Sequence, residues 1–209
     1  MGNTKYAPTP GQTIGPFFGY ALPYHHDNRL VTSGTPGAVR LHGTITDGHG
    51  VPVPDALLEI WQLDGEGNVV QRTGSMFDVA WQAGEVGKHS RTDEFTGWGR
   101  TEADREGGYW FRTIEPGSKD GKAPFFVMVI FARGLMNRLF TRIYLPENTA
   151  ALEADPLLSS LPADRRDTLI AKREADGSLR FDIKLQGEGE TVFLSYDPDP
   201  NSVKDGVHA

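Results

Sequence analysis

The chain has 209 residues, of which 38% are hydrophobic and 23% are charged, a composition typical of a globular protein with a packed core. Its 28 acidic and 21 basic residues give a net charge of −7, which disfavours nucleic acids and anionic membranes as partners. The absence of cysteine excludes disulfides, thiolate metal sites and cysteine nucleophiles. The N-terminal segment lacks the apolar run of a signal peptide and no stretch is long enough to span a membrane, so we expect a soluble, cytoplasmic protein.

The order of the chain suggests one domain with extensions. Residues 1–37 contain many Pro and Gly and show no sustained periodicity of apolar residues, which predicts an extended N-terminal arm. Residues 38–196 form the folded domain, interrupted by a long excursion at 71–97. The C-terminal segment 197–209 is predicted to be a disordered tail.

The first half of the domain contains four predicted strands. Residues 39–46 alternate apolar and polar side chains, which indicates a strand with one buried face. Residues 56–63 carry apolar side chains at both odd and even positions, which predicts a strand covered on both of its faces. Residues 109–114 alternate again, and the uninterrupted apolar run 125–131 is the best candidate for the central core strand.

The second half adds further strands and the only predicted helices. Residues 139–145 and 179–185 alternate as strands with one solvated face, and residues 191–195 predict a short last strand. Helices are expected over 148–154 and 162–175. Seven or more strands at turn-length spacing favour an all-β fold, a single-domain β-sandwich with an extended N-terminal arm and short peripheral helices.

Candidate catalytic groups are few. None of the six histidines has the spacing that lets two imidazoles share a metal, and the common nucleophile and phosphate-binding motifs are absent. Arg133 directly follows the apolar run, so its guanidinium needs an anionic partner. Two partners stay open at this point, a carboxylate of the same chain or an anionic ligand. Asp55, Glu59 and Asp64 are interpreted as solvated or paired carboxylates, and Arg142 as structural.

Several ordered strings point to a family. They span roughly residues 8–196 and comprise 9–17 (TPGQTIGPF), 55–62 (DALLEIWQ), 97–101 (GWGRT), 130–134 (IFARG), 141–144 (TRIY), 168–173 (TLIAKR), 181–183 (FDI) and 186–193 (QGEGETVF). Together these strings resemble the intradiol ring-cleaving dioxygenases, and more narrowly the α chains of the two-chain members that cleave protocatechuate.

The resemblance implies where the metal lies. In this family the β chain binds a non-haem ferric ion through two Tyr and two His, the latter as H-x-H on a core strand. Here these two His positions fall on Phe125 and Val127, and Ser118, Lys119 and Asp120 follow the turn at which the β chain offers a Tyr ligand. The resemblance therefore implies no metal ligand in this chain and Fe(III) bound by a partner β chain.

The resemblance also implies a role for the arm, which in this family reaches over the iron pocket of the β chain. By this resemblance Arg133 lies near the carboxylate end of the substrate, and Gly15 allows close approach of the backbone. The implied substrate-binding residues are Thr13, Ile14, Gly15, Pro16 and Arg133. Gly11 and Phe17 depart from the family pattern, and the excursion at 77–89 has no clear counterpart.

The implied reaction is cleavage of protocatechuate by O2 to 3-carboxy-cis,cis-muconate, with no catalytic group in this chain. The implied form is an obligate αβ unit within a higher symmetric oligomer. Two alternatives remain: a β-sandwich module that binds small ligands without a catalytic partner, and a self-sufficient homomeric catechol dioxygenase, which would need Tyr and His ligands within this chain.

Overall fold

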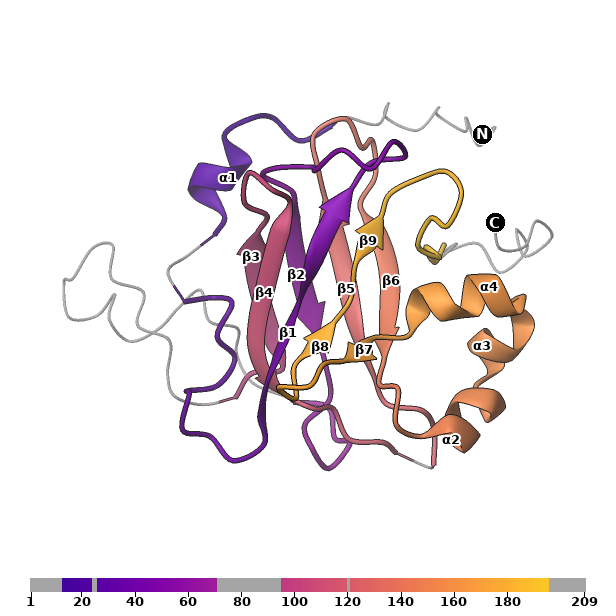
Figure 1. Cartoon of the computed structure of the whole chain (residues 1–209). Coiled ribbons are helices and arrows are strands. Elements are labelled where there is room, and N and C mark those ends of the chain that lie inside the picture. The colour runs from indigo at the N-terminus through magenta and orange to yellow at the C-terminus, as the bar shows by residue number, and fades with distance from the viewer. Residues whose placement is uncertain (1–12, 24–25, 71–94, 120, 196–209) are drawn as a thin grey trace, which may run out of the picture.

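The chain folds into two packed β-sheets, which confirms the predicted all-β sandwich (Figure 1). The structure, a computed structural model, describes residues 13–23, 26–70, 95–119 and 121–195. The first sheet has the order β4 (Gly108–Ile114), β1 (Ala38–Thr46), β8 (Leu179–Arg180), β7 (Lys172–Arg173), with β9 (Ile183–Lys184) also pairing with β1. The second has the order β3 (Trp98–Glu102), β2 (Leu57–Trp61), β5 (Phe125–Phe131), β6 (Leu139–Tyr144).

The core lies between the sheets because alternate strand residues point inward. Along β1, Val39, Leu41 and Ile45 are buried as predicted. The strand predicted to be most central, β5, lies between β2 and β6 and contributes Phe126 and Met128 to the same hydrophobic cluster. The period of two therefore sets which face of each long strand is buried.

Two predicted strands differ in the structure. The segment 179–185 follows β1 in parallel but is split into β8 and β9, with Phe181 N donating to His42 O at 2.8 Å between them. The strand predicted at 191–195 is wrong. The N–H group of Thr191 donates to Lys184 O of β9 at 2.9 Å, whereas that of Leu194 donates to Phe140 O in the second sheet at 2.7 Å. The segment therefore forms no continuous hydrogen-bond ladder with either strand.

The three helices α2, α3 and α4 lie together at one side of the sandwich (Figure 1). The helix predicted at 148–154 is confirmed as α2 (Thr149–Ala154), and α3 (Pro156–Ser160) follows unpredicted. The helix predicted at 162–175 is wrong beyond its first half. It forms only α4 (Ala163–Arg166) and a 3-10 turn (Asp167–Leu169). At Ile170, which pairs with Tyr144, the chain becomes extended and enters β7. Long-range strand pairing thus overrides the helical pattern.

Part of the predicted arm packs on the sandwich. It contains the short helix α1 (Phe18–Ala21), and further along Leu30 is buried in the main core while its amide donates to Arg112 O at 2.7 Å. The boundary at 37/38 stays a prediction, and the tail 197–209 and the excursion 77–89 lie outside the described residues. In the part of the chain that the structure describes, no helix is long and apolar enough to cross a membrane.

Candidate functional site

Arg133 is paired across the second sheet. β2 and β5 run antiparallel with Leu57 opposite Phe131, and continuing this register past both strand ends brings Asp55 opposite Arg133. Arg133 Nη2 lies 2.7 Å from Asp55 Oδ2. Of the two partners left open by the sequence, the structure thus contains the carboxylate of the same chain. The Arg133 side chain is nevertheless 52% exposed, because β5 ends two residues earlier, so part of the guanidinium stays accessible to an anion.

The arm meets Arg133 at the same edge of the sheet. Gly134 N donates to Thr13 Oγ1 at 2.7 Å, which ties the start of the described chain to the loop after β5 (Figure 1). Gly134 has a φ of +91°, a conformation that favours glycine and that turns the chain directly after Arg133. Thr13 therefore contacts the residue that directly follows Arg133.

The rest of the implied arm residues face outward. Ile14 is half-buried, whereas Gly15 and Pro16 are exposed. A Cβ atom placed on Gly15 would meet nothing within 4 Å in the described structure, so the close approach expected at Gly15 is not made to this chain. Phe17 is 76% exposed, and Met136, in the loop after Arg133, is 53% exposed. The arm and the loop after Arg133 thus each expose an apolar side chain, as contact surfaces do.

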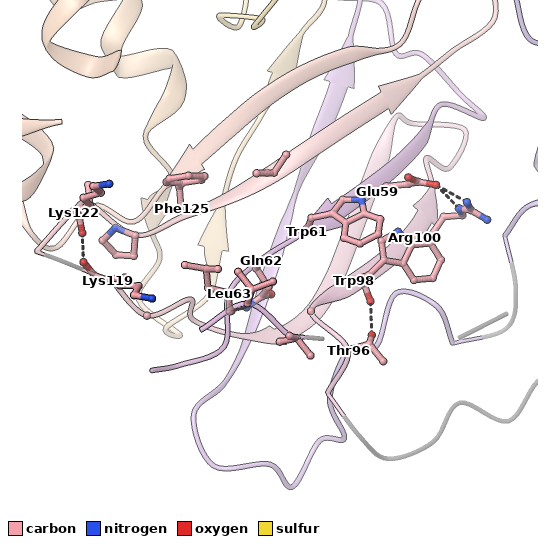
Figure 2. Close-up of a pocket in the computed structure, with 18 residues that line it drawn as sticks. Glu59, Trp61, Gln62, Leu63, Thr96, Trp98, Arg100, Lys119, Lys122 and Phe125 are labelled. Carbon is pink, nitrogen blue, oxygen red and sulfur yellow. Dashed lines mark hydrogen bonds and ion pairs between the residues drawn. The ribbon is translucent and has the colours of Figure 1, made fainter. Parts of the chain in front are cut away.

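A cavity of about 760 Å³ occupies the opposite end of the same sheet face (Figure 2). Its walls include the side chains of Trp61 and Trp98, whose rings lie 6.2 Å apart, and Lys119 and Lys122 lie across from them. Further lining residues are Glu59, Gln62, Leu63, Val69, Val70, Thr96, Gly97, Arg100, Gly117, Ser118, Ala123, Pro124, Phe125 and Val127. The cavity is therefore mainly aromatic and aliphatic, with its charges at the edge.

The only carboxylate among these lining residues is already paired. Glu59 Oε1 accepts from Arg100 Nε at 2.8 Å and from Arg100 Nη2 at 2.5 Å, as Figure 2 shows. Arg100 also donates to Leu22 O at 2.9 Å, which ties the arm to β3. Both side chains are about 14% exposed or less, so this ion pair is fixed in place beneath the cavity and is a poor metal ligand.

The residues around the cavity do not fit a ferric ion. Phe125 and Val127, the positions at which the family places its two His, lie on the cavity wall and offer no donor atom. Ser118, which follows the turn at which the resemblance places a Tyr ligand, donates its hydroxyl to Lys122 O. Across the described ranges, no three His, Cys, Asp or Glu side chains gather where they could hold a metal. The donor chemistry here is unsuited to Fe(III), which binds imidazole, phenolate and carboxylate groups.

The nearest phenol cannot replace a ligand. The Tyr144 ring lies 5.3 Å from that of Phe125, but its hydroxyl is buried and donates to Asp155 Oδ1 at 3.0 Å. Burial raises the pKa of Tyr144 to about 12, so the hydroxyl keeps its proton at neutral pH. The Arg142 guanidinium lies 4.3 Å from the centre of the Phe125 ring, which adds positive charge where a cation would have to bind.

The two ends of this face are separate sites. Val127 and Arg133 are six residues apart along an extended strand, about 20 Å. The sequence indicated that Arg133 needs an anionic partner but not that this partner is Asp55, since the pairing depends on strand register. The substrate-binding role of Thr13 and Arg133 stays a prediction. The cavity was also not predicted, although Trp61 and Trp98, which stand opposite one another in β2 and β3, would have indicated an aromatic wall if the pairing had been known.

Comparison with known proteins identifies related sequences. A family model described as "Dioxygenase" matches residues 13–187. The protocatechuate 3,4-dioxygenase alpha chain of Burkholderia cepacia is 37% identical over 208 residues, covering 91% of this chain and 98% of that one. The alpha chain from Pseudomonas putida is 34% identical over 209 residues, covering 90% and 96%. The beta chain from Burkholderia cepacia is 29% identical over 206 residues, covering 90% of this chain and 80% of that one.

Solved structures agree on the fold. An intradiol ring-cleavage dioxygenase from Tetranychus urticae superposes with a TM-score of 0.50 at 17% identity, covering 86% of this chain and 93% of that one. At this identity the likeness concerns the architecture alone.

Proposed function

Because this chain belongs to the intradiol dioxygenase family, we propose that it is the α subunit of a two-chain protocatechuate 3,4-dioxygenase. The observation that carries the proposal is the contrast between the two ends of one sheet face. The end where the family would bind metal is an aromatic cavity walled by Phe125 and Val127, whereas the arm and Arg133 form an outward-facing edge. We infer that this edge completes a site on another chain.

The partner in this proposal is a β chain that binds Fe(III), in an obligate αβ unit assembled into a higher oligomer in the cytoplasm. The ferric ion supplies activation of the bound catechol toward O2. The ring is cleaved between the two hydroxyl-bearing carbons and both oxygen atoms enter the product, 3-carboxy-cis,cis-muconate. A homomeric dioxygenase is disfavoured, because the residues at the cavity do not fit the metal.

This chain's residues bind and orient the substrate. Arg133 is held by Asp55 at 2.7 Å, so its direction is fixed while its exposed edge remains available to the substrate carboxylate. Thr13 fixes the start of the arm to the same loop, which places Gly15 and Pro16 on the open side. In this arrangement Thr13, Ile14, Gly15 and Pro16 line the partner's pocket and exclude water from it.

Arg133→Ala in the assembled αβ enzyme tests the substrate role. We expect the KM for protocatechuate to rise about tenfold, about 1.4 kcal/mol of lost binding. The KM for catechol, which has no carboxylate, should stay within about twofold. Arg138→Ala is the matched control, since Arg138 is an exposed arginine of the same loop. Equal effects of Arg133→Ala on both substrates would indicate a structural role only.

Reconstitution tests the assignment of subunits. The β chain is prepared with and without this chain, and O2 uptake on protocatechuate is measured for each preparation. We expect full activity only for the pair. Full activity of the β chain alone would contradict the proposal.

A further inference from the structure

Three arginines surround a single tryptophan on the outer face of the first sheet. The guanidinium carbon of Arg40 lies 5.7 Å from the Trp110 ring centre, and those of Arg29 and Arg112 lie 5.9 Å from it. Arg40 on β1 and Arg112 on β4 stand directly opposite each other in the register, and Arg29 bridges to Arg112 from the arm. We call Arg29, Arg40, Arg112 and Trp110 the Trp110 cluster.

The charge of the cluster is not neutralised by nearby carboxylates. Within the described ranges, none of its three arginines lies within 4 Å of an Asp or Glu oxygen, whereas Arg100, Arg133, Arg165, Arg173 and Arg180 all do. Like charges placed opposite each other on neighbouring strands destabilise a sheet. The indole face offsets only part of this repulsion. The arrangement therefore has an electrostatic cost that the fold alone does not explain.

On the two strand positions next to Trp110 in the register, the basic side chains are paired. Beside Trp110 in the register, His42 contacts Glu174 at 2.8 Å. Beside His42, Arg180 pairs with Asp182 at 2.9 Å, and hydrogen bonds from Arg180 and Thr44 lower the pKa of Asp182 although its burial acts to raise it. On this sheet face, the arginines with no described carboxylate within 4 Å are therefore those of the Trp110 cluster, in a chain whose net charge is −7. Lys172 on β7, opposite Arg180, is an exposed cation at the far edge of the same sheet.

We propose that the Trp110 cluster is a docking surface for an acidic segment of a partner polypeptide. Guanidinium groups bind carboxylates in pairs of hydrogen bonds, and the indole offers an apolar surface for the methylene groups of Glu and Asp. The cluster lies on a strand face, where Arg29 and Arg40 are exposed, and it is distant from the aromatic cavity on the second sheet. A compact cluster on an acidic chain suits a short acidic peptide better than the long phosphate backbone of a nucleic acid. The proposal does not depend on the proposed enzymatic function.

Binding of a labelled hexaglutamate peptide tests the proposal. Fluorescence anisotropy is measured with the full-length chain at low salt, and we expect saturable binding that weakens at least tenfold in Arg40→Gln/Arg112→Gln. The control Arg105→Gln/Arg138→Gln removes the same charge from two exposed arginines outside the cluster and should bind like the wild type. A thermal melt of each variant establishes that it is folded.

Three results would overturn the proposal: no binding by the wild type, equal loss in the control variant, or unchanged binding in Arg40→Gln/Arg112→Gln. A hexathymidylate oligonucleotide is measured in parallel. If it binds more tightly than the peptide and depends on the same two arginines, the surface is a nucleic-acid site and the proposal is wrong.

Discussion

Tyr144 and Asp155 form a buried polar contact between β6 and the helical region. The Tyr144 hydroxyl is fully buried and donates to Asp155 Oδ1 at 3.0 Å, while the same oxygen accepts from Leu157 N and Leu158 N at the start of α3. Asp155 is itself only 6% exposed. One carboxylate therefore joins the end of β6 to the helical region.

Tyr144→Phe is expected to destabilise the protein by about 1–2 kcal/mol, because the Asp155 oxygen loses one donor in a buried setting. With its pKa raised by burial to about 12, the contribution of Tyr144 is fully present below pH 10 and is lost as the pH rises toward 12. The measurement is urea unfolding at pH 7.

Phe140→Leu is a suitable control for Tyr144→Phe, since it changes an aromatic residue of the same strand without touching Asp155. A Tyr144→Phe variant as stable as the wild type would mean that the hydroxyl contributes nothing.

Single residues also show where sequence reasoning stops. The position of Arg133 after an apolar run correctly indicated a need for an anionic partner, but both candidates remained open. The choice depends on Asp55 standing opposite Arg133, 78 positions away, which follows from the register of β2 against β5. Periodicity reports which face a residue occupies and not which residue of another strand it meets.

At the scale of elements, the hairpin of β7 and β8 is fixed to β1 by side chains. Glu174 Oε2 contacts His42 Nε2 at 2.8 Å and accepts from Ser178 Oγ at 2.9 Å, and Glu174 N donates to Ser178 O at 2.9 Å. The Ser178 hydrogen bond, followed by that of His42, lowers the pKa of Glu174 below its usual 4.5. The ionised carboxylate therefore stabilises the hairpin above about pH 4.5, and this stabilisation is lost as the pH falls through the lowered pKa.

We expect Glu174→Gln to speed amide hydrogen exchange in this hairpin at pH 7, because the ionised carboxylate is lost. The difference in protection between pH 7 and acidic pH should also become smaller than in the wild type. Hydrogen exchange of the peptide covering 173–180 is the measurement, with faster exchange expected in the variant. Asp176→Asn is the control, because Asp176 accepts from the same Ser178 hydroxyl at 2.6 Å. If both variants exchange alike at every pH, the His42–Glu174 contact is not what holds the hairpin.

The elements themselves were predictable to different degrees. The strand β1 was found from its alternation of apolar and polar residues, and β5 from its uninterrupted apolar run. The helix expected over 162–175 ends early, since Ile170 pairs with Tyr144 of β6 and Lys172 pairs with Arg180 in the hairpin of β7 and β8. Residues 191–195 have the composition of a strand but divide their hydrogen bonds between two elements. Such outcomes depend on tertiary pairing, which local pattern does not contain.

At the scale of the whole molecule, one sheet face has two ends with different chemistry. The ordered strings resembled a family that the comparisons then confirmed, and Thr13 contacts Gly134, directly after Arg133. The cavity at the other end, walled by Trp61 and Phe125, was not predicted. We therefore expect the stability of this chain to come from its hydrophobic core and to be independent of iron in the proposed complex.

Removal of iron from the assembled enzyme tests that conclusion. A chelator that strips Fe(III) should abolish visible colour and O2 uptake, while hydrogen exchange of β5 in this chain should stay unchanged, because Phe125 and Val127 offer no ligand whose loss could loosen the strand. The corresponding strand of the β chain, measured in the same sample, should exchange faster and serves as the positive control. Faster exchange of β5 on iron removal would mean that this chain also contributes to metal binding, and the assignment of the iron to the partner would have to be abandoned.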